Sequence, residues 1–251
     1  MEFLTPEILA IAAPAVVFAG ISKGGFGSGA AFASSSVLAL VLEPGQALGI
    51  MLPLLMLMDA ATLKPYWGKW NWRDSRLLIL GALPGVVLGA LLWRVASPDV
   101  FRFLIGAVSL AFVLWMLAQA RGWIAPPKRM LPDWAGLLAG LTAGFTSFVS
   151  HAGGPPAAVY LLSRKPTKTQ FQASTVLIFW VINISKALPY AFLGIFSAAT
   201  LTADLILAPF ALLGAWIGVK AHFMVPERAF FLLTYVLLTL TGTKLIWDSL
   251  T

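Results

Sequence analysis

A lysine lies inside the first of two glycine-rich breaks between apolar stretches of the chain. This break spans residues 20–30, and its side chains and backbone groups are suited to holding a small anion. A lysine supplies positive charge, serine hydroxyls donate hydrogen bonds, and glycine lets a ligand approach the backbone closely. Lys23 either faces an anion or extends into water at a membrane interface. The expected substrate-binding residues of this break are Ser22, Lys23, Gly24, Gly25 and Ser28.

The second break, residues 147–157, places a histidine directly after a serine. The unperturbed pKa of histidine is near neutrality, so His151 could accept a coupling proton beside a bound anion, or it could be a structural donor. Ser150 could donate to oxyanion oxygens or cap a helix. Pro155 and Pro156 suit the first turn of a following helix, where N–H groups lack partners. The expected substrate-binding residues of this break are Ser150, His151, Gly153 and Gly154.

Three polar residues interrupt the longer apolar segments. Asn183 and Lys186 are three residues apart, so both project from one helical face and are expected at the substrate site. Lys186 could instead pair with Asp59 or bind backbone carbonyls. Asp59 could carry a coupling proton, or it could pair with Lys64 one turn further on.

The composition requires a lipid environment. Of 251 residues, 59% are apolar and 11% are charged, and the mean hydropathy is +0.88, which exceeds what the surface of a soluble domain carries. The net charge of +7 comes from short clusters of Lys and Arg between apolar runs, so nucleic acid is not an expected partner. The absence of cysteine excludes disulfides and thiol catalysis. No metal or other cofactor is expected, and the oligomeric state is not predicted.

Ten apolar segments divide into two groups of five, which predicts an all-α protein that crosses the membrane several times. The first two segments of each group are too short to cross about 30 Å of hydrocarbon comfortably, which suggests broken or re-entrant helices around a site. The segments are 8–20, 30–42, 45–63, 77–95, 101–120, 134–149, 155–162, 171–196, 205–219 and 229–250.

The two groups resemble each other in sequence. Asp59, Pro65 and Tyr66 have the same spacing as Asn183, Pro189 and Tyr190, which indicates an internal repeat. We therefore expect a first repeat at 1–120, a cytoplasmic linker at 121–133 and a second repeat at 134–251. Each repeat makes an odd net number of crossings, so the two repeats must be inverted relative to each other.

Basic residues predict the orientation. Twelve lysines and arginines lie in the loops 64–76, 121–133, 163–170 and 220–228, and the opposite loops hold only Arg94 and Arg102. By the positive-inside rule, both termini lie outside the cytoplasm of a bacterial inner membrane. Inverted repeats with broken helices place half-helix N-termini near the membrane midplane, where they attract anions.

The two breaks resemble the glycine-rich motifs of the TauE/SafE family, also called the toluene-sulfonate uptake permease family. Residues 23–27 are similar to its first motif and residues 151–156 to its second, and the likeness extends from about residue 18 to 246. The resemblance implies two repeats and a small sulfur-containing anion such as sulfite or a sulfonate. Where the first motif usually has a third glycine, this chain has Phe26, which could narrow the pocket or adapt it to an organic group.

The sequence favours a proton-coupled, alternating-access carrier over two alternatives. One is a channel or a carrier of another small anion. The other is an intramembrane hydrolase with Ser28 or Ser150 as nucleophile and His151 as base, but adjacent serine and histidine side chains suit that geometry poorly. An enzyme is therefore not expected. The expected partners are a small anion and the lipid bilayer.

Overall fold

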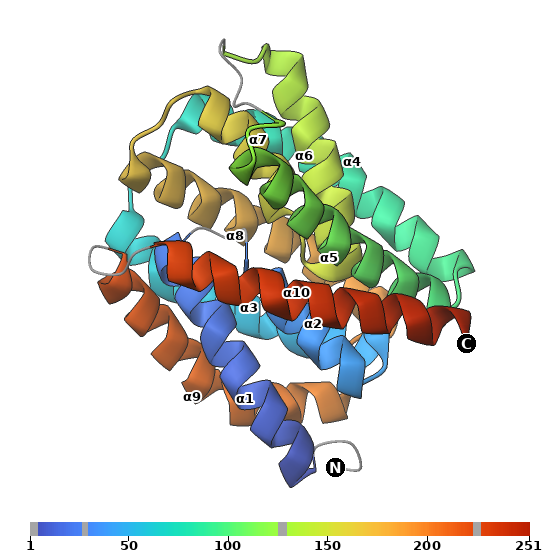
Figure 1. The fold of residues 1–251 in the computed structure, drawn as a ribbon. Helices are drawn as coiled ribbons and strands as arrows, with labels where there is room; N and C mark the ends of the chain where they lie inside the picture. Colours follow the sequence, from blue (N-terminus) through green and yellow to red (C-terminus); the bar gives the residue numbers. More distant parts are fainter. Residues whose placement is uncertain (1–4, 27–29, 125–129, 223–226) are drawn as a thin grey trace.

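The computed structural model describes residues 5–26, 30–124, 130–222 and 227–251, and every element within them is helical. Figure 1 shows the helices packed into one bundle, with α10 and α5 side by side across the face toward the viewer. The helices of the first half are α1 (Pro6–Ile21), the π-helical turn η1 (Ser22–Phe26), α2 (Phe32–Val41), α3 (Pro44–Tyr66), α4 (Trp72–Val95) and α5 (Pro98–Ala120). Those of the second half are α6 (Asp133–Ser150), α7 (Gly154–Ser163), α8 (Lys168–Phe192), α9 (Ala198–Ala221) and α10 (Glu227–Leu250).

Local sequence signals set where these helices begin. Proline occupies the first turn of α1, α3, α5 and α7, where its missing N–H costs nothing within the helix. Thr167 and Ser197 begin α8 and α9 with reciprocal capping bonds to the third residue of each helix. The helices therefore begin at positions that their own first residues specify.

Six stretches among the described residues are long and apolar enough to cross a membrane. They are Pro6–Phe26, Pro44–Tyr66, Trp72–Val95, Pro98–Ala120, Lys168–Phe192 and Ala198–Ala221. The protein is therefore a multi-pass, all-α membrane protein, as predicted. The second and seventh predicted segments form helices of 10 residues each, α2 and α7. A helix of that length spans about 15 Å, roughly half of the hydrocarbon layer.

Glycines bring two pairs of helices into backbone contact. On α6, a Cβ added at Gly144 would lie 2.1 Å from the carbonyl oxygen of Ala82 on α4. On α1, a Cβ at Gly20 would lie 2.6 Å from the backbone nitrogen of Ala215 on α9. Such close approach lets helices pack without a hydrophobic drive from lipid. The glycines spaced four apart thus determine which helices pair.

The packing has a reciprocal pattern. The first helix of the first half, α1, packs against α9, the fourth helix of the second half. In the same way α6, the first helix of the second half, packs against α4. The helices α3 and α8 contact each other, and so do α5 and α10. Elements from the two halves therefore interlock, with α3 and α8 meeting between them.

A charged network joins the helix ends near the predicted cytoplasmic loops. Arg164, just after α7, binds Asp74 at 3.2 Å and Asp133 at 2.8 Å. Hydrogen bonds from Arg73 and Arg164 lower the pKa of the exposed Asp133 carboxyl. The network links the beginnings of α4 and α6 to the end of α7.

Candidate functional site

The first break is a π-helical turn whose carbonyl groups are held by side chains from three other helices. Gln172 donates to the Lys23 carbonyl at 2.5 Å, and Tyr66 donates to the Gly24 carbonyl at 2.8 Å. Just after α9, Nδ1 of His222 lies 2.7 Å from the Gly25 carbonyl. Because a carbonyl oxygen only accepts, this ring nitrogen carries the hydrogen. Wide π-turns leave backbone carbonyls available and are frequent at functional sites.

Lys23 projects from this turn into the bundle and forms a buried ion pair with Asp59 of α3. The other carboxylate oxygen of Asp59 accepts a hydrogen bond from Asn183 of α8 at 2.7 Å. Both side chains of the ion pair are nearly inaccessible, at 3% and 1% exposure. The partner of Asp59 is thus Lys23, and neither Lys64 nor Lys186 forms the ion pair with it.

The second break ends α6 with His151 in the left-handed conformation, at φ 57°. Lys186 of α8 lies 3.0 Å from the Ser147 carbonyl, 2.9 Å from the Ser147 hydroxyl and 2.9 Å from Nδ1 of His151. An ammonium group only donates, so Nδ1 accepts and the hydrogen of the neutral ring is on Nε2. Nε2 is 3.3 Å from the Leu48 carbonyl, which accepts that hydrogen. His151 therefore orients Lys186 in this state.

These contacts leave Lys186 without a counter-ion in the buried centre. Lys23 and Asp59 neutralise each other, and the three partners of Lys186 are uncharged. Among the described residues, no carboxylate lies within ion-pair distance of Lys186, whose side chain is fully buried. A buried cation without a counter-ion is costly in a membrane and marks a site that an anion can occupy.

The start of α7 offers fewer backbone donors than we expected for an anion-binding helix N-terminus. Pro155 and Pro156 occupy its second and third positions and have no N–H group. The donors that remain in this turn are those of Gly153 and Gly154. Prolines that favour helix initiation thus reduce anion binding by the backbone, and side chains must supply more of it.

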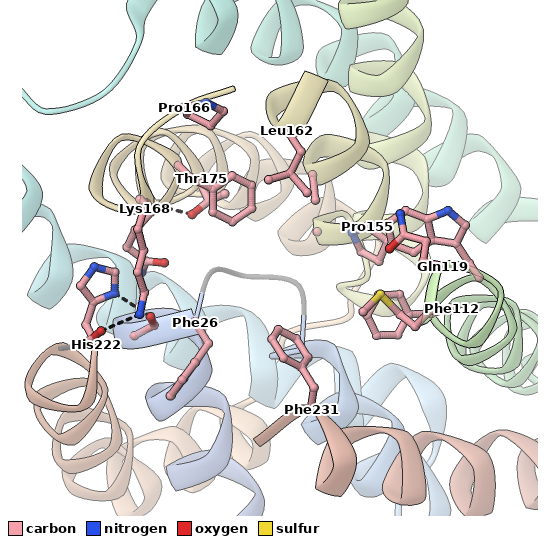
Figure 2. Close-up of a pocket in the computed structure, with 17 residues that line it drawn as sticks. Phe26, Phe112, Gln119, Pro155, Leu162, Pro166, Lys168, Thr175, His222 and Phe231 are labelled. Carbon is pink, nitrogen blue, oxygen red and sulfur yellow. Dashed lines mark hydrogen bonds between the residues drawn. The ribbon is translucent and has the colours of Figure 1, made fainter. Parts of the chain in front are cut away.

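A cavity of about 320 Å³ lies between the two breaks (Figure 2). Its wall includes Gly25 and Phe26 from the first break and Gly154 and Pro155 from the second. Figure 2 shows Lys168 and His222 at one end, where the lysine donates to the His222 carbonyl at 2.7 Å, and Phe112 and Gln119 at the other. Much of the remaining wall is aromatic. Both breaks therefore contribute to the wall of the cavity, which has a lysine and a histidine at one end.

The other predicted site residues of the two breaks are buried among helices or bonded to their own helix, where the structure describes them. Ser22 is buried in the π-turn, and Ser28 lies outside the described residues. Gly24 and Gly25 contact α9 so closely that a Cβ at either would lie within 2.5 Å of a backbone oxygen. Ser150 donates to the Thr146 carbonyl of its own helix at 3.0 Å, and so forms no pair with His151 as a hydrolase would need.

Five contributors to this site were not among the predicted site residues: Tyr66, Ser147, Gln172, Tyr190 and His222. Tyr190 donates to the Phe148 carbonyl at 2.7 Å, as Tyr66 does to Gly24. The equal spacing of the two tyrosines in the sequence repeat was the available signal for them. No spacing pattern pointed to His222, because it reaches Gly25 only through the packing of α9 against η1.

Comparison with known proteins identifies the family of this chain. A family profile described as sulfite exporter TauE/SafE matches residues 12–245. A protein from Cupriavidus necator named probable sulfite/organosulfonate exporter TauE is 26% identical over 186 residues, which cover 71% of this chain and 70% of that protein. No solved structure matches the chain. The profile covers almost the whole bundle, and the chain therefore belongs to the TauE/SafE sulfite exporter family of membrane transporters.

Proposed function

We propose that the protein is a proton-coupled secondary transporter of a small sulfur-containing anion, such as sulfite or a sulfonate. The observation that carries this proposal is the buried amino group of Lys186, which has only uncharged partners within hydrogen-bonding distance among the described residues. Family membership and the name of the Cupriavidus necator relative supply the sulfur chemistry. A bound anion would stabilise the protonated form of Lys186, which is the physical reason to expect an anionic substrate.

The substrate path we propose runs through the cavity between the breaks. Gln172 links the two regions, because it lines the cavity and its amide donates to the Lys23 carbonyl. An anion that enters beside Lys168 would reach the buried lysines when the π-turn moves aside. The aromatic wall near Phe26 suits an organic group attached to the acid.

Alternating access by two inverted repeats, 1–120 and 134–251 joined by residues 121–133, is part of the proposal. The reciprocal packing of α1 on α9 and of α6 on α4 supports it. So do the two tyrosine bonds, each of which joins residues 42 positions apart. Two similar halves around a common site allow one half to rock against the other. The basic loops support a bacterial inner membrane location with both termini outside the cytoplasm.

Flux measurements in proteoliposomes test this function. We expect saturable movement of sulfite or a short sulfonate that responds to a pH gradient, with sulfate and thiosulfate as comparison substrates. Lys186→Met should abolish it, whereas Lys244→Met, which alters an exposed lysine, should not. Nonsaturating conductance would indicate a channel, and transport by Lys186→Met at the wild-type rate would refute the site.

A further inference from the structure

Asp204 is a buried carboxylate that takes no part in the site described above. It lies in the second turn of α9, one of the six membrane-crossing stretches. The residue is 7% exposed, and neither carboxylate oxygen has a hydrogen-bond partner among the described residues. The group thus differs from Asp59, whose two oxygens are both bonded.

Among the described residues, the surroundings of Asp204 provide no counter-charge. Its neighbours Ala203 and Leu207 belong to an apolar cluster with residues of α1 and α3. The elements packed against α9 are α1, α3 and η1. Their titratable or charged side chains, with the cap of α3, are Glu7, Lys23, Glu43, Asp59, Lys64 and Tyr66, whose hydroxyl donates to the Gly24 carbonyl. Glu7, Glu43 and Lys64 are exposed, and Lys23 and Asp59 bind each other.

An ionised carboxylate in such a place would be strongly destabilising. Charge burial in a bilayer costs several kcal/mol unless a partner compensates it, and a protonated carboxyl group avoids most of that cost. The described structure thus fits the protonated form of Asp204. For the group to lose this proton, it needs a path to water.

A cavity whose wall lies one helical turn from Asp204 is the nearest part of such a path. Thr200 precedes Asp204 by four residues, about one turn or 5.4 Å along the helix. It lines a cavity of about 550 Å³ that also includes Glu43, Gln46 and Ser197. These residues lie on the side with few basic loops, which the proposed orientation places outside the cytoplasm. Protons from that side can therefore come within one turn of the carboxyl group.

We propose that Asp204 is the group that binds and releases the proton coupled to transport. In one state of the protein a carboxylate oxygen of Asp204 exchanges one proton with external water, and in the other state it exchanges that proton with cytoplasmic water, so each cycle carries one proton across the membrane. This inference rests on the proposed function. It assigns coupling to Asp204 rather than to the two residues we first expected, because Asp59 is held by Lys23 and Asn183, and His151 by Lys186.

The matched variants for the test are Asp204→Asn and Asp248→Asn. Asparagine resembles a protonated carboxyl group in size but cannot lose a proton, and Asp248 is a partly exposed aspartate near the chain end. In proteoliposomes with labelled sulfite, Asp204→Asn should keep counterflow exchange within about twofold of wild type. It should lose accumulation driven by a pH gradient. Asp248→Asn should behave like wild type in both assays.

Infrared difference spectroscopy between acidic and alkaline pH gives a second readout that needs no substrate. The C=O stretching band of a buried protonated carboxyl group should be present in wild type and in Asp59→Asn, and absent in Asp204→Asn. Accumulation by Asp204→Asn at the wild-type level, loss of its counterflow, or a band that survives the substitution would each overturn the proposal. A wild-type protein that moves no anion would instead refute the transported substrate, while the infrared band still decides the protonation of Asp204.

Discussion

The two buried lysines should respond in opposite ways to the same substitution. Lys23→Met removes the partner of Asp59 and leaves that carboxylate buried with only the Asn183 hydrogen bond. Breaking a buried pair in this way costs about 3–5 kcal/mol. Lys186→Met removes a buried amino group that has no counter-ion, and it leaves three acceptors, the carbonyl and hydroxyl of Ser147 and Nδ1 of His151, without this donor. The two effects oppose each other, so stability should stay within about 2 kcal/mol of wild type or rise.

Thermal unfolding in detergent measures this difference. For a chain of this size, 3–5 kcal/mol corresponds to a decrease in Tm on the order of 10 °C for Lys23→Met. Adding Asp59→Asn to that variant should restore most of the stability, because the lone buried charge disappears. Sulfite binding provides the functional side of the comparison. Loss of one charge-assisted bond of about 1.5–3 kcal/mol should weaken binding by Lys186→Met roughly 10- to 150-fold.

Two outcomes would refute this reasoning about charge balance. Equal losses of stability in Lys23→Met and Lys186→Met would show that the two lysines have the same electrostatic role. Sulfite affinity of Lys186→Met equal to that of wild type would show that its charge does not attract the anion. Lys244→Met serves as the control for both measurements, because Lys244 is 60% exposed.

Three further predictions concern the framework. Gly144→Ala should lose about 1–3 kcal/mol in thermal unfolding, because its Cβ would force α6 away from α4, whereas Gly45→Ala meets only a tryptophan side-chain edge at 3.3 Å and should have little effect. Tyr190→Phe removes the donor of a 2.7 Å bond to a buried carbonyl and should cost about 1–3 kcal/mol in the same assay. Asp133 has a lowered pKa, so its stabilising bonds with Arg73 and Arg164 persist at neutral pH and are lost as the pH falls through that value. The stability difference between wild type and Asp133→Asn should therefore begin to shrink below about pH 4 and disappear once the pH is below the lowered pKa of Asp133.

Each of these predictions has a contrary result. A Gly144→Ala protein as stable as Gly45→Ala would show that the helices can separate without cost. Unchanged stability of Tyr190→Phe would mean that water replaces the tyrosine at that carbonyl. A pH-independent gap between wild type and Asp133→Asn would exclude ionisation as its source.

Apolar segment length and glycine spacing determined much of the fold. A chain in lipid must satisfy its backbone within helices, so long apolar runs translate directly into membrane-crossing helices. Four segments were predicted to be too short to span the hydrocarbon, and two of them, now α2 and α7, form helices of 10 residues each. The prediction was wrong for segment 8–20, because α1 continues through the π-turn into a 21-residue stretch, Pro6–Phe26, that is long enough to cross. Segment length did not predict which backbone donors are available. Pro155 and Pro156 were correctly predicted in the first turn of α7, but they lack the N–H groups that an anion would bind.

The sequence by itself also indicated that Asn183 and Lys186 share one helical face, and it made them, Lys23 and Asp59 candidates for a buried site, because polar groups in membrane helices tend to face protein. It left open which charge pairs with which. Only the tertiary structure decided that Lys23 takes Asp59, because the π-turn directs this lysine toward α3. Lys186 is left with neutral partners for the complementary reason, since α8 places it beside the end of α6. Pairing depends on distances between helices far apart in sequence, and these distances follow from the packing of the whole bundle.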